Sequence, residues 1–337
     1  MKTRYSFCRK IIMPLLLFIT WNAPAFLSAE LSYIDPGFYS YGARAAALGS
    51  ACTSLSFSPV VQLWNPAGIN SLAGIHNISF DHAMILDLVS YNYAGYAHRA
   101  KRSAYALGMT YSGDAALAEY SAYVTVAGNL GMIPAIDNSD FQILRTANMG
   151  INFRYVGFYF GNNADGAFID DEGYNHQVKG QAHGMGMDLG LMLHPVTGQR
   201  LGIMWRNLLS EIWWHSRNET GTALGNYREN MSSSLQMGYS LDYNNVLLAF
   251  DYHKAMHREL ADEFRIGLEY RFFAGIFSLR TGYSQETFSG GNRKVAAGTG
   301  FRLEFDSQTT LEIDLAYLVI TSWEGHNSLL ISINLTR

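Results

Sequence analysis

The feature that most constrains this chain is a strict alternation of apolar and polar residues in its second half. From Phe264 to Phe272 every even position is apolar or aromatic, whereas the odd positions carry two arginines, a glutamate and a glycine. Successive side chains of a β-strand point to opposite faces, so this segment predicts a strand with one apolar face and one charged face. Helical spacing does not fit the same residues.

The same alternation recurs from about residue 74 to the C-terminus, and turn-forming residues such as Asp242-Tyr243-Asn244-Asn245 separate the alternating segments. Short connections predict that neighbouring strands pair antiparallel. No proline follows Pro195, as expected where every strand is paired on both sides. The expected strands lie near residues 74–83, 88–98, 103–112, 120–127, 146–158, 182–193, 200–207, 231–242, 245–254, 262–273, 276–286, 294–305, 308–320 and 326–336.

An even number of strands, each close to the 9–11 residues that a tilted membrane strand needs, is typical of an outer-membrane barrel. The alternative is a soluble β-sandwich or barrel, whose outer face needs charge. Charged residues make up only 15% of this chain, against about 25% in ordinary soluble domains, and there are six lysines against eighteen arginines. We therefore predict an all-β fold, a transmembrane antiparallel β-barrel of about 14 strands formed by residues 74–337, with the apolar parity facing lipid.

The first 29 residues have the layout of a secretory signal peptide. Four basic residues precede an apolar run from Ile11 to Thr20, and small residues around Ala25 and Ala29 offer cleavage sites. The alternative, an N-terminal membrane anchor, is disfavoured because the apolar run is short for a bilayer. We predict export to the outer membrane of a Gram-negative-type bacterium, and a mature chain in which Cys52 is the sole cysteine.

Residues 45–80 contain no Asp, Glu, Lys or Arg, yet glycine and proline interrupt them too often for a membrane helix. Irregular backbone at membrane depth is tolerated only inside protein or along a water-filled cavity. We therefore predict that residues 30–73 form a hatch, a plug segment lying inside the barrel. An ordinary loop packed on one end of the barrel is the alternative.

This N-terminal region also carries a family resemblance. The segment from Gly42 to Ala51, followed by Leu63 to Ile69, resembles the N-terminal signature of FadL-type outer-membrane proteins, and in particular the PorV/PorQ branch. Later segments around Met187–Leu191, Leu279–Ser284 and Ala297–Phe301 are similar to the same branch. The chain departs from the pattern at its end, because Arg337 stands where such barrels often finish on an aromatic residue. By this resemblance the hatch motif is Asn65, Pro66, Ala67 and Gly68.

The resemblance implies a channel for passive uptake of long-chain fatty acids or other hydrophobic compounds, with outer-membrane lipid around it. An apolar ligand needs an apolar pocket, and arginines inside the barrel can hold a carboxylate by charge-assisted hydrogen bonds. For each arginine the alternative is an ion pair with an acid inside the barrel, and for Trp64 it is simple packing. The expected ligand-binding residues are Phe57, Val61, Leu63, Trp64, Arg265, Arg271, Arg280 and Arg302.

A second function fits the resemblance as well, since PorV-like proteins act as outer-membrane components of a protein-secretion system. An enzyme is not expected, because no Gly-x-Ser-x-Gly elbow is present and the histidines lack metal-ligand spacing. We expect no catalytic residues, metal or cofactor. The formal net charge of −4 argues against a basic nucleic-acid-binding protein.

Overall fold

The fold is described from a computed structural model, which covers residues 41–113, 117–137, 142–161, 179–217, 223–257, 260–287, 291–321 and 327–337. The predicted signal peptide, and residues 30–40 of the predicted hatch, lie outside these ranges. Within them, no helix has both the length and the apolar character needed to cross a bilayer.

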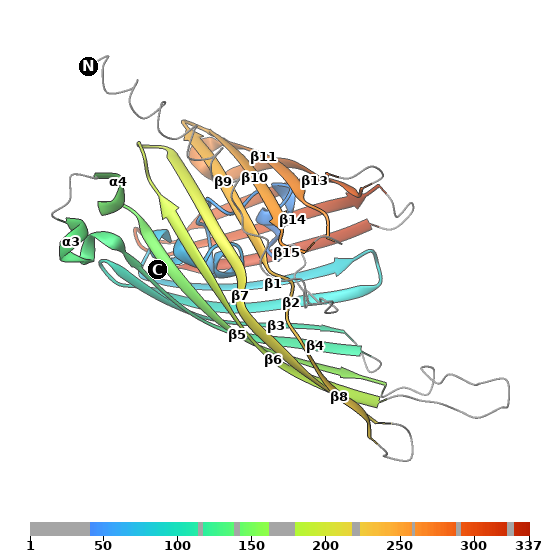
Figure 1. Cartoon of the computed structure of the whole chain (residues 1–337). Helices are drawn as coiled ribbons and strands as arrows, with labels where there is room; N and C mark the ends of the chain where they lie inside the picture. The colour runs from blue at the N-terminus through green and yellow to red at the C-terminus, as the bar shows by residue number, and fades with distance from the viewer. Residues whose placement is uncertain are drawn as a thin grey trace. The chain divides into compact units, whose positions relative to one another are not determined.

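The described residues contain fifteen antiparallel strands that form one sheet, and the sheet closes on itself because β1 pairs with β15 and β6 pairs with β7 (Figure 1). The strands are β1 (His76–Ile85), β2 (Val89–Arg99), β3 (Ser103–Gly113), β4 (Leu117–Asn129), β5 (Asn148–Phe160), β6 (Lys179–Leu193), β7 (Gln199–Arg217), β8 (Ala223–Glu229), β9 (Ser234–Tyr243), β10 (Val246–Ala255), β11 (Glu263–Phe272), β12 (Phe277–Glu286), β13 (Arg293–Glu304), β14 (Thr310–Ile320) and β15 (Asn327–Thr336).

Strands β8 and β9 share one position in the wall. The first half of β7 pairs with β9 and its second half pairs with β8, so the described barrel has fourteen strand positions. This confirms the predicted fold class. The prediction was wrong in ending the seventh strand near residue 207, because β7 continues to Arg217, and it did not include β8.

The prediction that the apolar residues of each strand face outward, and the alternating polar residues inward, is confirmed. On β11, Phe264 and Tyr270 are exposed on the outside at 50% and 42%, whereas Arg265 and Glu269 are buried inside. Other strands repeat this division, with an apolar outer face and an inner face that combines buried polar residues with apolar residues packed on the hatch. The outer surface of a protein surrounded by lipid has this character.

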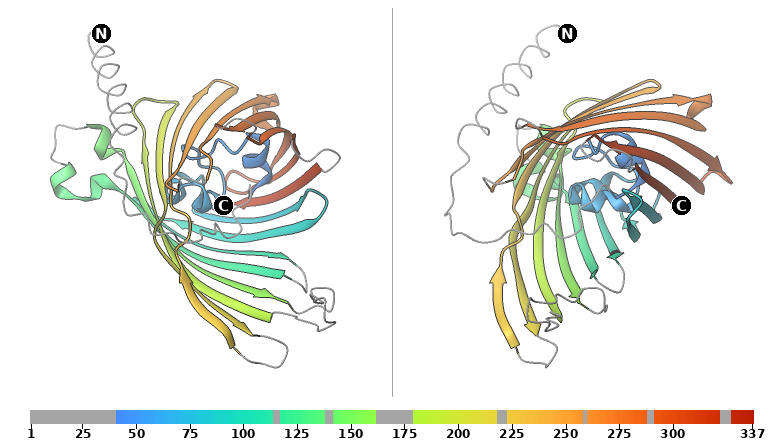
Figure 2. Two further views of the ribbon diagram at one scale, coloured as in Figure 1. Left: turned by 45° about the vertical axis from the view of Figure 1, so that its right-hand side comes forward. Right: turned by 90° about the vertical axis from the view of Figure 1, so that its right-hand side faces the viewer.

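Inside the barrel lies the described part of the hatch, residues 41–73 (Figure 2, blue). It contains a short helix α2 (Ala43–Ala47) and two 3-10 helices, η1 (Pro59–Leu63) and η2 (Pro66–Ser71). Helix α2 contacts β12 to β15, whereas η2 contacts β2 to β6. Most hatch side chains are fully buried, so the apolar core of the protein is the contact between the hatch and the inner wall.

The two ends of the barrel differ in their connections. At the end that contains the C-terminus, tight turns join β2 to β3 and β9 to β10, and η5 (Phe273–Gly275) joins β11 to β12. At this C-terminal end a longer connection between β4 and β5 holds η3 (Leu130–Met132), α3 (Pro134–Asp137) and α4 (Gln142–Arg145). The other end is called the opposite end below.

Candidate functional site

Inward-facing glycines of the wall create the space in which the hatch backbone lies. A Cβ atom added at any of these glycines would overlap hatch atoms, chiefly backbone. At the closest approach, Gly282 of β12 lies against Leu48 and Gly49, and Gly49 itself has a φ of +63° that favours glycine. The wall glycines that touch the hatch in this way are Gly108, Gly150, Gly190, Gly202, Gly238, Gly267, Gly282 and Gly298.

The predicted hatch motif shapes the turn that enters η2. The Asn65 side chain accepts a hydrogen bond from the Ala67 amide at 3.0 Å, and Pro66 occupies the first helical position, as in a capped helix start. The Asn65 amide group donates to the Thr53 carbonyl at 2.7 Å and to the Leu191 carbonyl of β6 at 3.2 Å. One buried side chain therefore joins two parts of the hatch to the wall.

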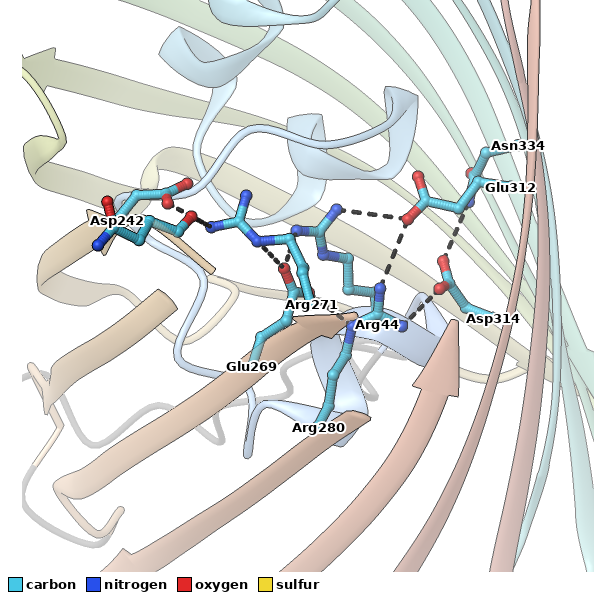
Figure 3. Close-up of polar contacts among 9 residues, drawn as sticks. Arg44, Asp242, Glu269, Arg271, Arg280, Glu312, Asp314 and Asn334 are labelled. Atoms are coloured by element: carbon cyan, nitrogen blue, oxygen red, sulfur yellow. Dashed lines mark hydrogen bonds and ion pairs between the residues drawn. The ribbon is translucent and has the colours of Figure 1, made fainter. Parts of the chain in front are cut away.

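An ion-pair network fastens α2 to the wall (Figure 3). Arg44 donates to Glu269 at 2.9 Å and lies 3.6 Å from Glu312. Burial lowers the pKa of Arg44, but these two carboxylates outweigh burial and the pKa is raised overall. Arg44 is therefore a permanent cation, and it holds the hatch against β11 and β14.

Of the four arginines predicted to hold a ligand carboxylate, three are paired with acids inside the barrel. Arg280 lies 2.7 Å from Glu269 and also pairs with Asp314. Arg271 pairs with Asp242, and Arg265 pairs with Glu263.

The fourth arginine, Arg302, lies near the C-terminal end with 47% of its side chain exposed, 3.5 Å from Glu304. The alternative expected for each arginine, an ion pair, is the arrangement present. A ligand-binding role for any of them stays a prediction.

The four apolar residues predicted to line a pocket are spread through the hatch. Trp64 is fully buried, donates to the Tyr41 carbonyl at 3.1 Å, and lies beneath the Arg265 guanidinium. Val61 and Leu63 are also buried, in two separate apolar clusters. Only Phe57 keeps part of its surface open, with Arg44 stacked 5.4 Å from its ring. Trp64 therefore offers no exposed surface to a ligand in this arrangement of the hatch.

A cluster of apolar residues that was not predicted lies on the inner face of the wall toward the opposite end. Because Val156 and Phe158 share the inward parity of Arg154, and Ile212 and Trp214 share that of Arg206, these four side chains point into the barrel. The Trp214 ring stacks on Phe158 at 5.6 Å and on Tyr227 at 5.8 Å. We call this set the aromatic patch, and it consists of Val156, Phe158, Phe160, Ala182, Ile212, Trp214, Tyr227 and Met231.

The aromatic patch has a polar border. The indole N–H of Trp214 has no hydrogen-bond partner among the described residues, and Arg154 donates to Asn207 and to the Met231 sulfur. A sequence signal for the patch existed, since Tyr155–Phe160 and Ile212–Trp214 are apolar on both parities. An apolar inner face combined with an apolar outer face removes the alternation.

A chain of hydrogen bonds runs from the hatch toward this patch. Gln62 of η1 accepts from Thr125 at 2.8 Å, Thr125 shares its hydroxyl with Asn152, and Asn152 donates to Asp188 at 3.0 Å. The Asp188 carboxylate accepts from the backbone N–H of Asn207 at 2.8 Å. This contact lies at a bulge of β7, where residues 206–208 stand opposite Asp188 alone. All of these groups are buried, so the chain links the hatch to the residues that border the patch.

Two features of a reactive centre, a metal-binding cluster and an activated cysteine, are missing from the described part of the chain. No group of three or more His, Cys, Asp or Glu residues there could hold a metal ion. Cys52 is buried in the hatch as a free thiol, and burial raises the pKa of this thiol well above the ordinary value. A buried thiol with a raised pKa is unreactive.

Fold and site together define a class of protein, a fourteen-position β-barrel with an apolar outer surface, closed inside by an N-terminal hatch. No family model matches the sequence, and no curated protein matches it. Solved structures share the fold over most of the chain. The CymD monoaromatic hydrocarbon channel is 13% identical with a TM-score of 0.59, over 91% of this chain and 98% of that chain.

Two further structures give the same result. The Pseudomonas putida toluene transporter TodX is 14% identical with a TM-score of 0.57, over 91% of this chain and 99% of its own. A Pseudomonas aeruginosa FadL homologue is 10% identical with a TM-score of 0.59, over 88% and 97%. The chain therefore has the fold of FadL-type channels.

Proposed function

We propose that this protein is an outer-membrane channel for passive uptake of hydrophobic compounds, with long-chain fatty acids as its first candidate substrate. The observation that carries the proposal is the aromatic patch, because it is the one apolar cluster of the described inner wall that includes no hatch residue. Most of the patch is buried, but the Tyr227 ring is 50% exposed and Trp214 and Phe160 are partly exposed. Partly exposed rings over a buried apolar cluster give an apolar ligand a surface to contact. The shared fold with the hydrocarbon and toluene channels supports the same class of substrate.

The connections suggest how the barrel lies in the membrane. Outer-membrane barrels have short turns on the periplasmic side and longer loops outside. We therefore assign the C-terminal end, with its tight turns, to the periplasm and the opposite end to the cell exterior. Near that end the outer faces of β7 and β8 carry Glu211 and Arg228, an exposed ion pair at 3.4 Å, as expected where strands extend beyond the lipid.

In this orientation the aromatic patch meets a ligand arriving from outside, and the hatch closes the path beyond it. Stacked rings hold an acyl chain or an aromatic ring by apolar contact, while the Trp214 indole N–H can donate to a carboxylate oxygen. Passage then requires the hatch to shift, because its residues fill the space between opposite walls. The ion pair of Arg44 and the glycine contacts set the cost of that shift.

Trp214→Ala tests the proposal, and Trp213→Ala is its matched control because Trp213 is the outward-facing neighbour on the same strand. Removing one stacked ring should lower uptake of a labelled fatty acid into proteoliposomes roughly 2- to 10-fold. Heat-dependent gel mobility verifies that each variant forms a barrel. Equal uptake by wild type and Trp214→Ala would refute the role of the patch, and running toluene beside the fatty acid separates the two substrate classes.

The narrower resemblance to the PorV/PorQ branch, and the secretion role that accompanies it, stays a prediction. A tightly held hatch is compatible with a barrel that presents a surface to other proteins. Purification in mild detergent separates the two functions. Bound fatty acid at one molecule per barrel supports uptake, whereas a large protein partner with no bound lipid supports secretion.

A further inference from the structure

A cleft of about 330 Å³ opens at the C-terminal end, away from the aromatic patch. It lies where the β2–β3 turn, the connection between β4 and β5, and the end of η2 come together. Volumes of this size accommodate small ligands or headgroups. The described residues that line it are Asn70, Lys101, Arg102, Asn129, Gly131, Asp137, Arg145, Thr146 and Asn148.

The lining of the cleft is strongly cationic. Lys101, Arg102 and Arg145 contribute three positive charges, and Asp137 is the one carboxylate among the described lining residues. Arg102 reaches across the cleft to the Gly131 carbonyl at 3.5 Å, so its side chain extends over the cavity. An excess of cations around a polar cavity favours an anion with several acceptor oxygens, of which phosphate is the common biological case.

The surroundings of the cleft are apolar on the outside. Met149, at the start of β5, and Tyr105, near the start of β3, face outward and are exposed. Met132, the last residue of η3, and Ile133, which follows it, have exposed fractions of 52% and 45%. A molecule with an anionic head in the cleft therefore has apolar surface beside it for a hydrocarbon chain. Basic pockets at the membrane surface bind lipid headgroups in this way.

We propose that this cleft binds the phosphate-bearing headgroup of an anionic phospholipid from the membrane leaflet at the C-terminal end. The proposal rests on the membrane location given above, but on neither the aromatic patch nor the transported substrate. Lys101 and Arg102 at the turn, with Arg145 on α4, hold the phosphate, and the acyl chains lie on the outer apolar surface.

The cleft also touches the hatch. Asn70 is the last residue but one of η2. Its side-chain amide donates to the Asn148 side chain at 2.8 Å, and the Asn148 side-chain amide donates to the Ser71 hydroxyl at 2.9 Å. The Asn70 side-chain oxygen is buried and has no hydrogen-bond partner among the described residues. A headgroup hydroxyl, such as those of glycerol, can donate to it. The bound lipid therefore contacts both the wall and the end of the hatch.

Native mass spectrometry of the purified full-length barrel tests the proposal, with phosphatidylglycerol and phosphatidylcholine added in equal amounts. The wild type should retain phosphatidylglycerol preferentially. Lys101→Ala/Arg102→Ala should weaken that retention about 30-fold, since each cation near a membrane surface contributes about fivefold. Arg228→Ala/Arg293→Ala removes the same charge from exposed positions elsewhere and should leave retention unchanged.

Arg145→Ala gives a second, independent variant with an expected weakening of about fivefold. Equal retention of both lipids by the wild type, or equal loss in both double variants, would overturn the proposal. Inorganic phosphate added at the lipid concentration should not displace the lipid, and displacement would assign the cleft to free phosphate instead. Normal lipid selectivity together with absent fatty-acid uptake would contradict the channel function alone.

Discussion

The contact between Gly282 and Gly49 offers a sharp test of how the hatch is held. Gly282→Ala places a methyl group against the hatch backbone, where the neighbouring atoms belong to Leu48 and Gly49 and cannot rotate away. Overpacking of this kind costs about 1–3 kcal/mol. The wall is a closed hydrogen-bonded sheet, so we expect the hatch rather than the wall to move.

Cys52 reports that movement. It is fully buried in the hatch, and a maleimide reaches it only when the hatch opens locally. A cost of 1–3 kcal/mol raises the open population about 5- to 150-fold, and the labelling rate rises by the same factor. Peptide mass spectrometry quantifies labelling at Cys52 separately from any other thiol.

Gly186→Ala is the matched control. Gly186 also faces inward, on β6, but a methyl group there meets its nearest neighbours at the ordinary distance of 3.5 Å. Its labelling rate should equal that of the wild type. An unchanged rate in Gly282→Ala, or equal acceleration in both variants, would refute the account of the hatch as held by close glycine contacts.

Other perturbations follow from the same contacts. Asn65→Ala removes the helix cap and the hydrogen bond to Thr53, at a cost of about 1–3 kcal/mol, and should speed labelling of Cys52 in the native barrel. Arg44→Gln removes the charged hydrogen bond to Glu269 and should speed labelling about tenfold, the equivalent of about 1.5 kcal/mol, whereas Arg293→Gln should not. Because the raised pKa of Cys52 lowers its thiolate fraction, the native thiol should react far more slowly than the denatured thiol at mildly alkaline pH, and equal rates would contradict its burial. Unheated protein should migrate differently from boiled protein on a denaturing gel, and identical mobility would argue against a barrel.

Much of the wall could be predicted from sequence because side-chain alternation is a local property of a strand. On β11 the apolar parity from Phe264 to Phe272 defines both the strand and its outward face, and the structure has the strand at Glu263–Phe272. The uncharged segment before the barrel likewise predicted a buried hatch. Its fully buried residues, such as Trp64, agree with that interpretation of composition.

The aromatic patch could not be predicted in the same way. Alternation identifies a strand only where the inner face is polar, and the inner face of β5 and β7 is apolar at Phe158 and Trp214. The bulge at Asn207 adds a second difficulty, because its φ of +50° interrupts the ladder of β7 without any proline or glycine to mark it. The predicted seventh strand therefore ended at the bulge, and the second half of β7 was missed together with its partner β8.

Ion pairing also lies beyond a single sequence. Parity places Arg280, Glu269 and Asp314 on the inner face, but the register between β11, β12, β13 and β14 decides which of them meet. Arg44 of the hatch belongs to the same network, although it is far from the strand residues in the sequence. A cluster drawn from the hatch and three strands requires the closed barrel for its recognition.

The whole account depends on the claim that the apolar residues of each strand face lipid and the polar residues face the interior of the barrel. Nitroxide scanning of β11 in lipid bilayers tests this claim most directly. Single cysteines at positions 264, 265, 268, 269 and 270, in a Cys52→Ala background, carry the label one at a time. Labels at Phe264, Leu268 and Tyr270 should be relaxed strongly by oxygen dissolved in lipid, and those at Arg265 and Glu269 weakly. The reverse pattern, or equal relaxation at all five positions, would contradict a barrel whose apolar face meets the membrane.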